Sequence, residues 1–153
     1  TGAAVHLVQA DLLQPLPFLQ PFDLVVVDAP CSGLGTLRRD PDIRWRRREQ
    51  DLPVLAAAEL TMLQHAADAV APGGRLLYAT CSSEPDENEA VADAFLATTP
   101  GFAPIDLRTA APDLAAAGDL VDARGHLRTE PHAHQLEAFF AAAFVRRGPL
   151  GER

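Results

Sequence analysis

The chain of 153 residues contains no lysine, only two cysteines, and no apolar run of the roughly 20 residues needed to cross a bilayer. Two cysteines without a Cys-x-x-Cys pair exclude the dense disulfide framework of a small secreted protein, although they allow a single disulfide. The five histidines are scattered, so we expect no bound metal. Neither an initiator methionine nor a basic leader precedes Val5, and we expect a cytoplasmic protein, with no membrane association, whose native N-terminus lies upstream.

Charge is unevenly distributed along the chain. The formal net charge is −8, which argues against a surface that binds nucleic acid throughout, because Lys and Arg provide most phosphate binding. All 13 basic residues are arginines, and a positive arm at positions 38–48 holds six of them. Such an arm can bind RNA or be a solvated loop, and we expect Trp45 to pack at its root rather than to stack on a base. The six are Arg38, Arg39, Arg44, Arg46, Arg47 and Arg48.

Hydrophobic patterning predicts alternating strands and helices in one domain. Residues 5–10 and 24–27 are short apolar runs, as expected for buried strands. The apolar spacing over residues 52–70 approximates one face of a helix, and residues 75–80 form a further predicted strand. A strand, helix and parallel strand require a right-handed crossover. The pattern therefore favours an open α/β sheet, in which ligands bind beyond the carboxyl ends of the strands.

The second half of the chain is less regular. An acidic first turn indicates a helix over residues 87–97, since negative charge suits the positive end of the helix dipole. Residues 108–135 are rich in Ala, Pro, Gly and Asp, and they are interpreted as a long surface connection with one short helical turn. Residues 139–147 are expected to form a last, antiparallel strand.

Each of the two cysteines follows a predicted strand, within a distinctive motif. Asp28-Ala29-Pro30-Cys31-Ser32-Gly33 and Tyr78-Ala79-Thr80-Cys81-Ser82 resemble the two signature motifs of the RNA (cytosine-5) methyltransferases of the Sun/Fmu family. The segment from Arg38 to Trp45 resembles more narrowly the branch that methylates 16S ribosomal RNA. This resemblance implies an α/β, Rossmann-like class I S-adenosylmethionine-dependent methyltransferase fold that here lacks its first strands. Residues 1–147 would be the later part of the catalytic domain, and residues 148–153 a tail.

The resemblance also implies roles for individual residues. Cytosine C5 is a poor nucleophile, so its methylation needs a thiolate that adds first to C6, and Cys81 would be this nucleophile. Cys31 would assist release of the methylated product. Asp28 would face the cytosine or the methyl donor, S-adenosylmethionine, and Pro30 would shape the base pocket. Asp11 would read the adenine of the cofactor, because a carboxylate accepts hydrogen bonds from an amino group.

The expected substrate is 16S ribosomal RNA, bound through four arginines of the arm. Two alternatives stay open: the same chemistry on transfer RNA or large-subunit RNA, and a non-catalytic fragment that only binds RNA or a partner. A thiol redox protein is disfavoured by the lack of a Cys-x-x-Cys pair. The four arginines are Arg38, Arg39, Arg44 and Arg46.

Three departures from the family pattern affect these expectations. Glu137-Ala138-Phe139-Phe140 stands where the family has Asp-Gly-Phe-Phe, and an alanine run replaces the basic residue expected shortly afterwards. We expect the strand to form despite these changes. The Gly-rich loop and the ribose-binding acidic residue of the family would precede Thr1, and Gly33-x-Gly35 lacks the spacing to replace that loop. Residues 1–153 alone are therefore expected to bind the cofactor very weakly and to transfer no methyl group.

Overall fold

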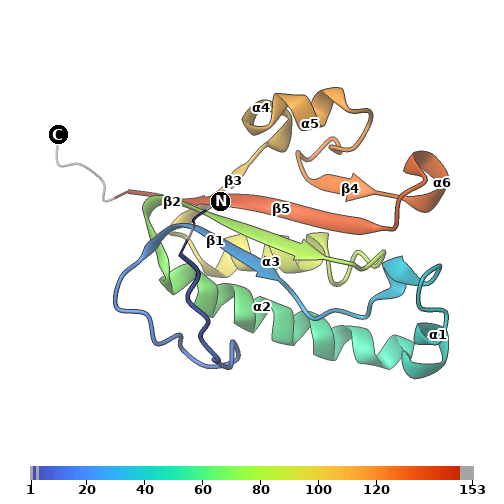
Figure 1. Cartoon of the computed structure of the whole chain (residues 1–153), viewed down its shortest axis with the longest axis horizontal. Helices are drawn as coiled ribbons and strands as arrows, with labels where there is room; N and C mark the ends of the chain where they lie inside the picture. Colours follow the sequence, from blue (N-terminus) through green and yellow to red (C-terminus); the bar gives the residue numbers. More distant parts are fainter. Residues whose placement is uncertain (1, 3, 149–153) are drawn as a thin grey trace.

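The computed structural model describes residues 2 and 4–148 and contains a mixed five-stranded sheet. The strands have the spatial order β1-β2-β5-β3, and β4 pairs with β5 beside this path (Figure 1). β1 and β2 are parallel, whereas β5 is antiparallel to its three neighbours, as predicted for the last strand. The strands are β1 (Phe22–Asp28), β2 (Val70–Thr80), β3 (Phe102–Ile105), β4 (Leu127–Thr129) and β5 (Phe139–Arg146).

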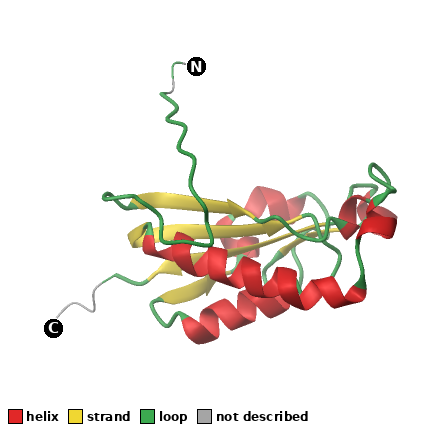
Figure 2. Ribbon diagram, turned by 90° about the horizontal axis from the view of Figure 1, so that it is seen from below, coloured by secondary structure: helices red, strands yellow, loops and turns green. Residues whose placement is uncertain are grey.

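Two long helices cover one face of the sheet (Figure 2). They are α2 (Leu52–Asp68) and α3 (Glu89–Thr98), and both lie within a residue or two of the predicted helices. The short helical segments are η1 (Leu34–Thr36), α1 (Ile43–Arg46), η2 (Glu49–Asp51), α4 (Leu107–Ala110), α5 (Pro112–Ala116) and α6 (Pro131–His134). No helix among the described residues is long and apolar enough to span a membrane.

The hydrophobic core lies between the sheet and these two helices. Buried Leu63 of α2 and Phe95 of α3 pack against Leu76, Tyr78 and other inward-facing residues of the strands. The opposite face of β1 is open, and Leu24 and Val26 are more than half exposed. Alternate residues of a strand point to opposite faces, which explains why Val27 is buried while its neighbours are not.

The structure corrects three predictions. Residues 5–10 form no strand: Val5 and Leu7 are exposed, and no strand among the described residues pairs with them. An apolar run alone cannot make a strand, because its backbone groups need a neighbouring ladder. The short strand β3 was missed; Pro104 weakens its signal, and it lies at the end of the sheet order, where proline is tolerated. Residues 108–135, expected to be a surface connection with one turn, contain β4 and helical segments.

The predicted tail, residues 148–153, lies outside the described residues except for Gly148. The strand after Glu137 does form as β5, despite the alanines that depart from the family pattern. Small side chains suit this strand, since Ala142 of β5 is fully buried and contributes to the core. β5 therefore completes the sheet next to β2 and holds the cysteine-bearing end of that strand in place.

Candidate active site

The two cysteines meet at one edge of the sheet, as the parallel crossover predicts. Cys31 follows the carboxyl end of β1, Cys81 follows that of β2, and their Sγ atoms lie 3.3 Å apart. Both are free thiols. Cys31 is buried and Cys81 is half-buried, so Cys81 is the sulfur that a substrate can reach.

The two thiols differ in their chemical environment. Burial, followed by the hydrogen bond with Cys81, raises the pKa of Cys31 to about 12. Cys31 is therefore protonated at neutral pH, and its S–H can donate toward the Sγ of Cys81. A thiol that keeps its proton is a poor nucleophile but can stabilise a neighbouring thiolate.

A buried carboxylate that the sequence reasoning missed joins the two cysteine-bearing loops. Glu87 is fully buried just before α3, and its Oε1 accepts a hydrogen bond from the Ser32 backbone N–H at 2.6 Å. Its Oε2 accepts from the Ser32 hydroxyl at 2.6 Å and from the Ser82 hydroxyl at 2.5 Å. A serine directly after each cysteine was the available signal, but nothing in the spacing pointed to Glu87 as their shared partner.

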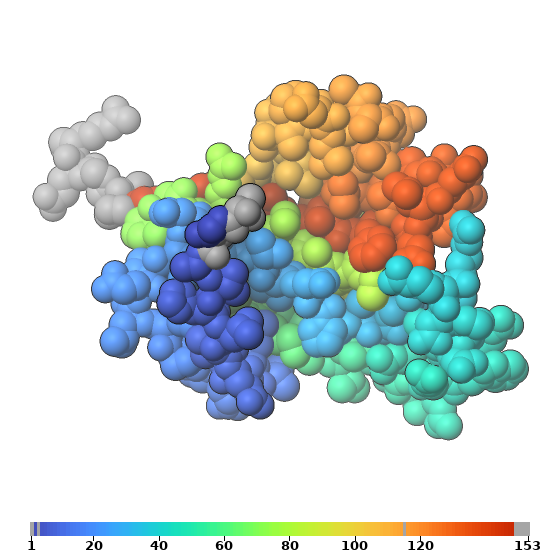
Figure 3. Space-filling model, in the orientation of Figure 1, coloured from blue at the N-terminus to red at the C-terminus, as the bar shows by residue number. Residues whose placement is uncertain are grey.

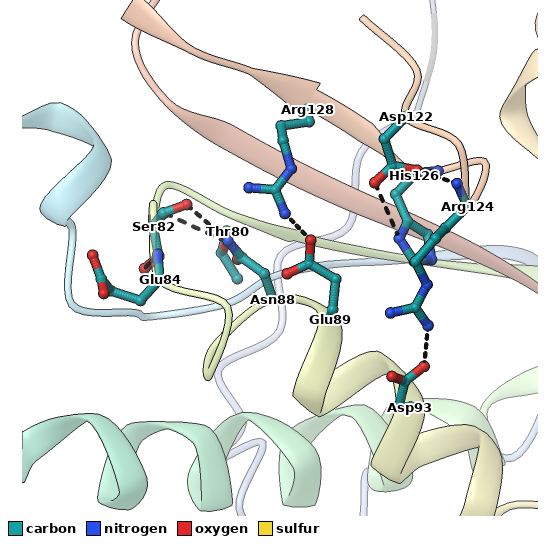
Figure 4. A network of polar contacts seen from close by, with 10 residues as sticks. All are labelled: Thr80, Ser82, Glu84, Asn88, Glu89, Asp93, Asp122, Arg124, His126 and Arg128. Atoms are coloured by element: carbon teal, nitrogen blue, oxygen red, sulfur yellow. Dashed lines mark hydrogen bonds and ion pairs between the residues drawn. The ribbon is translucent and has the colours of Figure 1, made fainter.

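The loop that carries Cys81 is further fixed by side chains from neighbouring elements. The Asn88 side chain donates to the carbonyl of Ser82 at 3.0 Å and accepts from Thr80 Oγ1 at 2.5 Å (Figure 4). All three residues are buried, and buried polar groups with satisfied hydrogen bonds give a site a defined shape. The loop is thus held by the strand that precedes it and by the residue that caps the next helix.

Backbone contacts fix the Cys31 loop from the other side. Gly35 donates its N–H to the carbonyl of Cys81 at 3.0 Å and accepts from the N–H of Ala138 at 3.0 Å. A Cβ at Gly35 would lie 2.2 Å from the Ala138 oxygen, so this close approach requires glycine. Arg47 donates to the carbonyls of Ser32 and Cys31, at 3.1 and 3.4 Å.

The three other predicted pocket residues lie on the surface. Asp28 ends β1 and Pro30 follows it; both are exposed beside the buried Cys31. No hydrogen bond or ion pair within the described part of the chain engages the Asp28 carboxylate. Asp11 is exposed in the segment before β1, where its Oδ1 accepts from the N–H of Leu13 at 2.9 Å. The structure thus brings Asp28 and Pro30 next to the thiols, whereas Asp11 belongs to a separate turn.

The predicted arginine arm forms an exposed surface around α1, shown in cyan at the opposite end of the molecule from the N-terminal segment (Figure 3). Arg44 lies over the ring of Trp45 at 5.9 Å, and Trp45 is 80% exposed. The expectation that Trp45 packs at the root of the arm is therefore wrong; Arg47 anchors the arm instead. Of the four arginines expected to bind substrate, Arg39 and Arg46 also pair with acidic neighbours at 3.6 to 3.9 Å.

Comparison with known proteins now identifies the family. Residues 2–145 match the family model described as 16S rRNA methyltransferase RsmB/F. The chain belongs to this family. It is 38% identical over 128 residues to the ribosomal RNA small subunit methyltransferase B of Salmonella arizonae, an alignment that covers 84% of this chain but 27% of that protein.

Solved structures share the fold of this chain. The structure of PH0851 superposes with a TM-score of 0.69 at 36% identity, covering 80% of this chain and 26% of the other. A methyltransferase homolog protein from Pyrococcus horikoshii superposes with a TM-score of 0.63 at 25% identity, covering 83% and 40%. The predicted Rossmann-like methyltransferase fold is thereby confirmed, and the chain spans well under half of the length of each of these three proteins.

Two hollows of the chain are lined in part by residues close to Cys81 in the sequence. One, of about 220 Å³, is lined by Ser82, Ser83, Arg128 and other residues of the β4 region. Arg128 forms an ion pair with Glu89 of α3, as seen in Figure 4. The larger hollow, of about 450 Å³, is mainly apolar and lies over Ala79 of β2 and Phe139 of β5. Since Ala79 is the register partner of Asp28, this hollow adjoins the carboxyl end of β1.

Proposed function

We propose that this chain carries the catalytic cysteines of an S-adenosylmethionine-dependent RNA (cytosine-5) methyltransferase that acts on 16S ribosomal RNA. The observation that carries the proposal is the pair of thiols 3.3 Å apart, with one half-exposed and the other buried and protonated, at the carboxyl edge of a methyltransferase sheet. The activity is assigned to the complete gene product, because the chain spans 27% of the Salmonella relative.

The environments of the two thiols support different roles in the proposed reaction. The Cys81 thiolate adds to C6 of cytosine, which forms a sulfur–carbon bond and places electron density on C5. S-adenosylmethionine supplies the methyl group that C5 takes up. The C5 proton then leaves to solvent, its electron pair restores the C5–C6 double bond, and the C6–sulfur bond breaks. The Cys31 S–H, 3.3 Å away, stabilises the departing Cys81 thiolate by a hydrogen bond, which assists product release.

The three other predicted pocket residues have the chemistry that these ligands need. Asp28 presents an exposed carboxylate next to the Cys31 loop, free to accept from an amino or hydroxyl group of the base or the methyl donor. Pro30 offers a rigid, exposed apolar ring directly before Cys31 in the sequence. Asp11 uses only one of its two oxygens for the turn to Leu13, which leaves the other for the adenine amino group.

The exposed arginine arm supports an RNA substrate. Arg38, Arg39, Arg44 and Arg46 would contact phosphates, and a target base must leave its stack to reach a half-buried sulfur. The name of the Salmonella relative favours small-subunit ribosomal RNA over transfer RNA, and such a substrate would place the protein in the cytoplasm.

Cysteine variants of the complete protein, incubated with 16S ribosomal RNA and S-adenosylmethionine, test the proposal. Cys81→Ala should abolish methyl transfer, because no other group can add to C6. Cys31→Ser should accumulate a covalent protein–RNA adduct that survives a denaturing gel, since the departing thiolate loses its stabilising thiol. An adduct that accumulates with Cys81→Ala and not with Cys31→Ser would reverse the two roles, and methylation by both variants would refute the thiol mechanism.

A further inference from the structure

Glu87 has no part in the steps above, yet it is a fully buried acid between the two cysteine-bearing loops. We propose that Glu87 is a positioning residue that sets the separation of the Cys31 and Cys81 thiols. Its effect on catalysis rests on the function proposed above, whereas its effect on thiol geometry does not.

Three hydrogen-bond donors from two loops converge on one carboxylate. Ser32, next to Cys31, donates through its backbone N–H and its hydroxyl, and Ser82, next to Cys81, donates through its hydroxyl, all at 2.5 to 2.6 Å. The two serine oxygens also lie 3.2 Å from each other. Hydrogen bonds to a carboxylate are short and strong, and moving either loop away would take at least one donor from this buried group. The carboxylate therefore holds each serine, and with it the adjacent thiol, in a fixed place.

The main chain at Glu87 is itself anchored by β2 and by the loop of Cys81. The main-chain carbonyl of Glu87 accepts from the Tyr78 hydroxyl at 2.6 Å, and Tyr78 is a fully buried residue of β2. The next residue, Asn88, binds the carbonyl of Ser82 at 3.0 Å. Glu87 is thus fixed relative to the sheet and to the start of α3, and its hydrogen bonds hold the two cysteine-bearing loops in place relative to them.

Burial excludes direct contact with a substrate. Because Glu87 is 0% exposed, it acts through Ser32 and Ser82 rather than on the reacting atoms. Its loss should reduce kcat while KM for RNA and for the methyl donor stays unchanged, since binding groups on the surface are untouched.

Thiol geometry can be measured without catalysis by titration with phenylarsine oxide. This arsenical condenses with two thiols to form two arsenic–sulfur bonds and releases one water, so its affinity reports whether both sulfurs are held ready for one small bridging atom. In the complete protein, Glu87→Gln should weaken the affinity by about tenfold or more, as expected for the loss of one charge-assisted hydrogen bond. Cys31→Ser gives the baseline for a single thiol at this site.

Glu84→Gln is the matched control, because Glu84 lies in the same loop and, among the described residues, its carboxylate accepts only from the adjacent Ser83, at 2.8 Å. It should keep wild-type affinity and kcat. Ser82→Ala removes one of the hydrogen bonds by which Glu87 joins the two loops, and it should weaken arsenical binding as well. This variant replaces Glu87→Gln if Glu87→Gln does not fold. In the double variant the two losses of arsenical affinity should not add, since both substitutions break the same hydrogen bond between Ser82 and Glu87.

Wild-type arsenical affinity in Glu87→Gln or, if that variant does not fold, in Ser82→Ala would overturn the positioning role, as would additive effects in the double variant. A fall in arsenical affinity together with an unchanged kcat would limit the role of Glu87 to the resting geometry and overturn its link to catalysis. If Cys81→Ala retained methyl transfer, the proposed function would fail, and the arsenical titration would still decide whether Glu87 positions the thiols.

Discussion

Gly35→Ala should displace the nucleophile through a backbone collision. The new Cβ would lie 2.2 Å from the Ala138 oxygen and 2.7 Å from the Cys81 oxygen, where ordinary contacts begin at 3.4 Å. Both obstacles are carbonyl groups, so no side-chain rotation relieves the overlap. The backbone at Gly35 must move away from Ala138 and Cys81 by roughly 1 Å, which would break at least one of the two 3.0 Å backbone hydrogen bonds of Gly35.

Two effects of this displacement can be estimated. Overpacking of this kind costs about 1–3 kcal/mol of stability, and a catalytic group misplaced by about 1 Å can lose roughly 10²-fold in rate. Single-turnover methyl transfer and thermal unfolding of the complete protein measure both. Gly101→Ala is the control, because nothing lies within 4 Å of its added Cβ. Wild-type rate and melting temperature in Gly35→Ala would refute the reasoning.

Two further predictions concern a buried acid and the arginine arm. Burial, and then the charge of Glu87, raises the pKa of Glu59 from 4.5 to about 8, so the unfolded chain releases a proton between these pH values that the folded chain retains. The free energy of unfolding should therefore fall by a few kcal/mol as pH rises through this window, as measured by urea unfolding. Glu59→Gln should remove this fall. If the free energies of unfolding of the two proteins changed with pH in parallel, the prediction would be contradicted. Replacing Arg38 and Arg44 by Ala should lower the slope of log affinity for RNA against log salt by roughly 0.7 to 0.9 per lost phosphate contact. The control, Arg108→Ala, should leave this slope unchanged. An equal slope in all variants would mean that the arm is a solvated surface and does not bind phosphates.

The raised pKa of Glu59 also accounts for the contacts of Tyr78. The Tyr78 hydroxyl lies 3.0 Å from Glu59 Oε2 and 2.6 Å from the Glu87 carbonyl, although it has one proton to donate. A protonated Glu59 can donate to Tyr78, which then donates to Glu87. One oxygen of this buried acid of α2 is thereby paired, whereas Glu59 Oε1 has no hydrogen-bond partner among the described residues.

Local patterns predicted the elements that form this half of the fold. Apolar runs identified the strands that became β1, β2 and β5, and helical spacing identified α2 and α3, because burial on one or two faces leaves a periodic trace in neighbouring residues. The same reasoning placed the loops of Cys31 and Cys81 at one sheet edge, since parallel strands share the direction of their carboxyl ends. It also predicted a strand at residues 5–10, which does not form, because no strand among the described residues pairs with this apolar run.

The details that make the site were decided only by tertiary structure. Glu87 meets Ser32 across 55 positions of sequence, and Gly35 meets Ala138 across about a hundred; neither contact has a periodic signal. Trp45, whose aromatic side chain favoured packing, is exposed, and hydrogen bonds of Arg47 anchor the arm instead. Residue type and local order along the chain therefore determined which groups could react and at which strand ends they would stand. Their separation, burial and protonation arose only when distant segments packed together, because these properties depend on neighbours that the chain brings together in space.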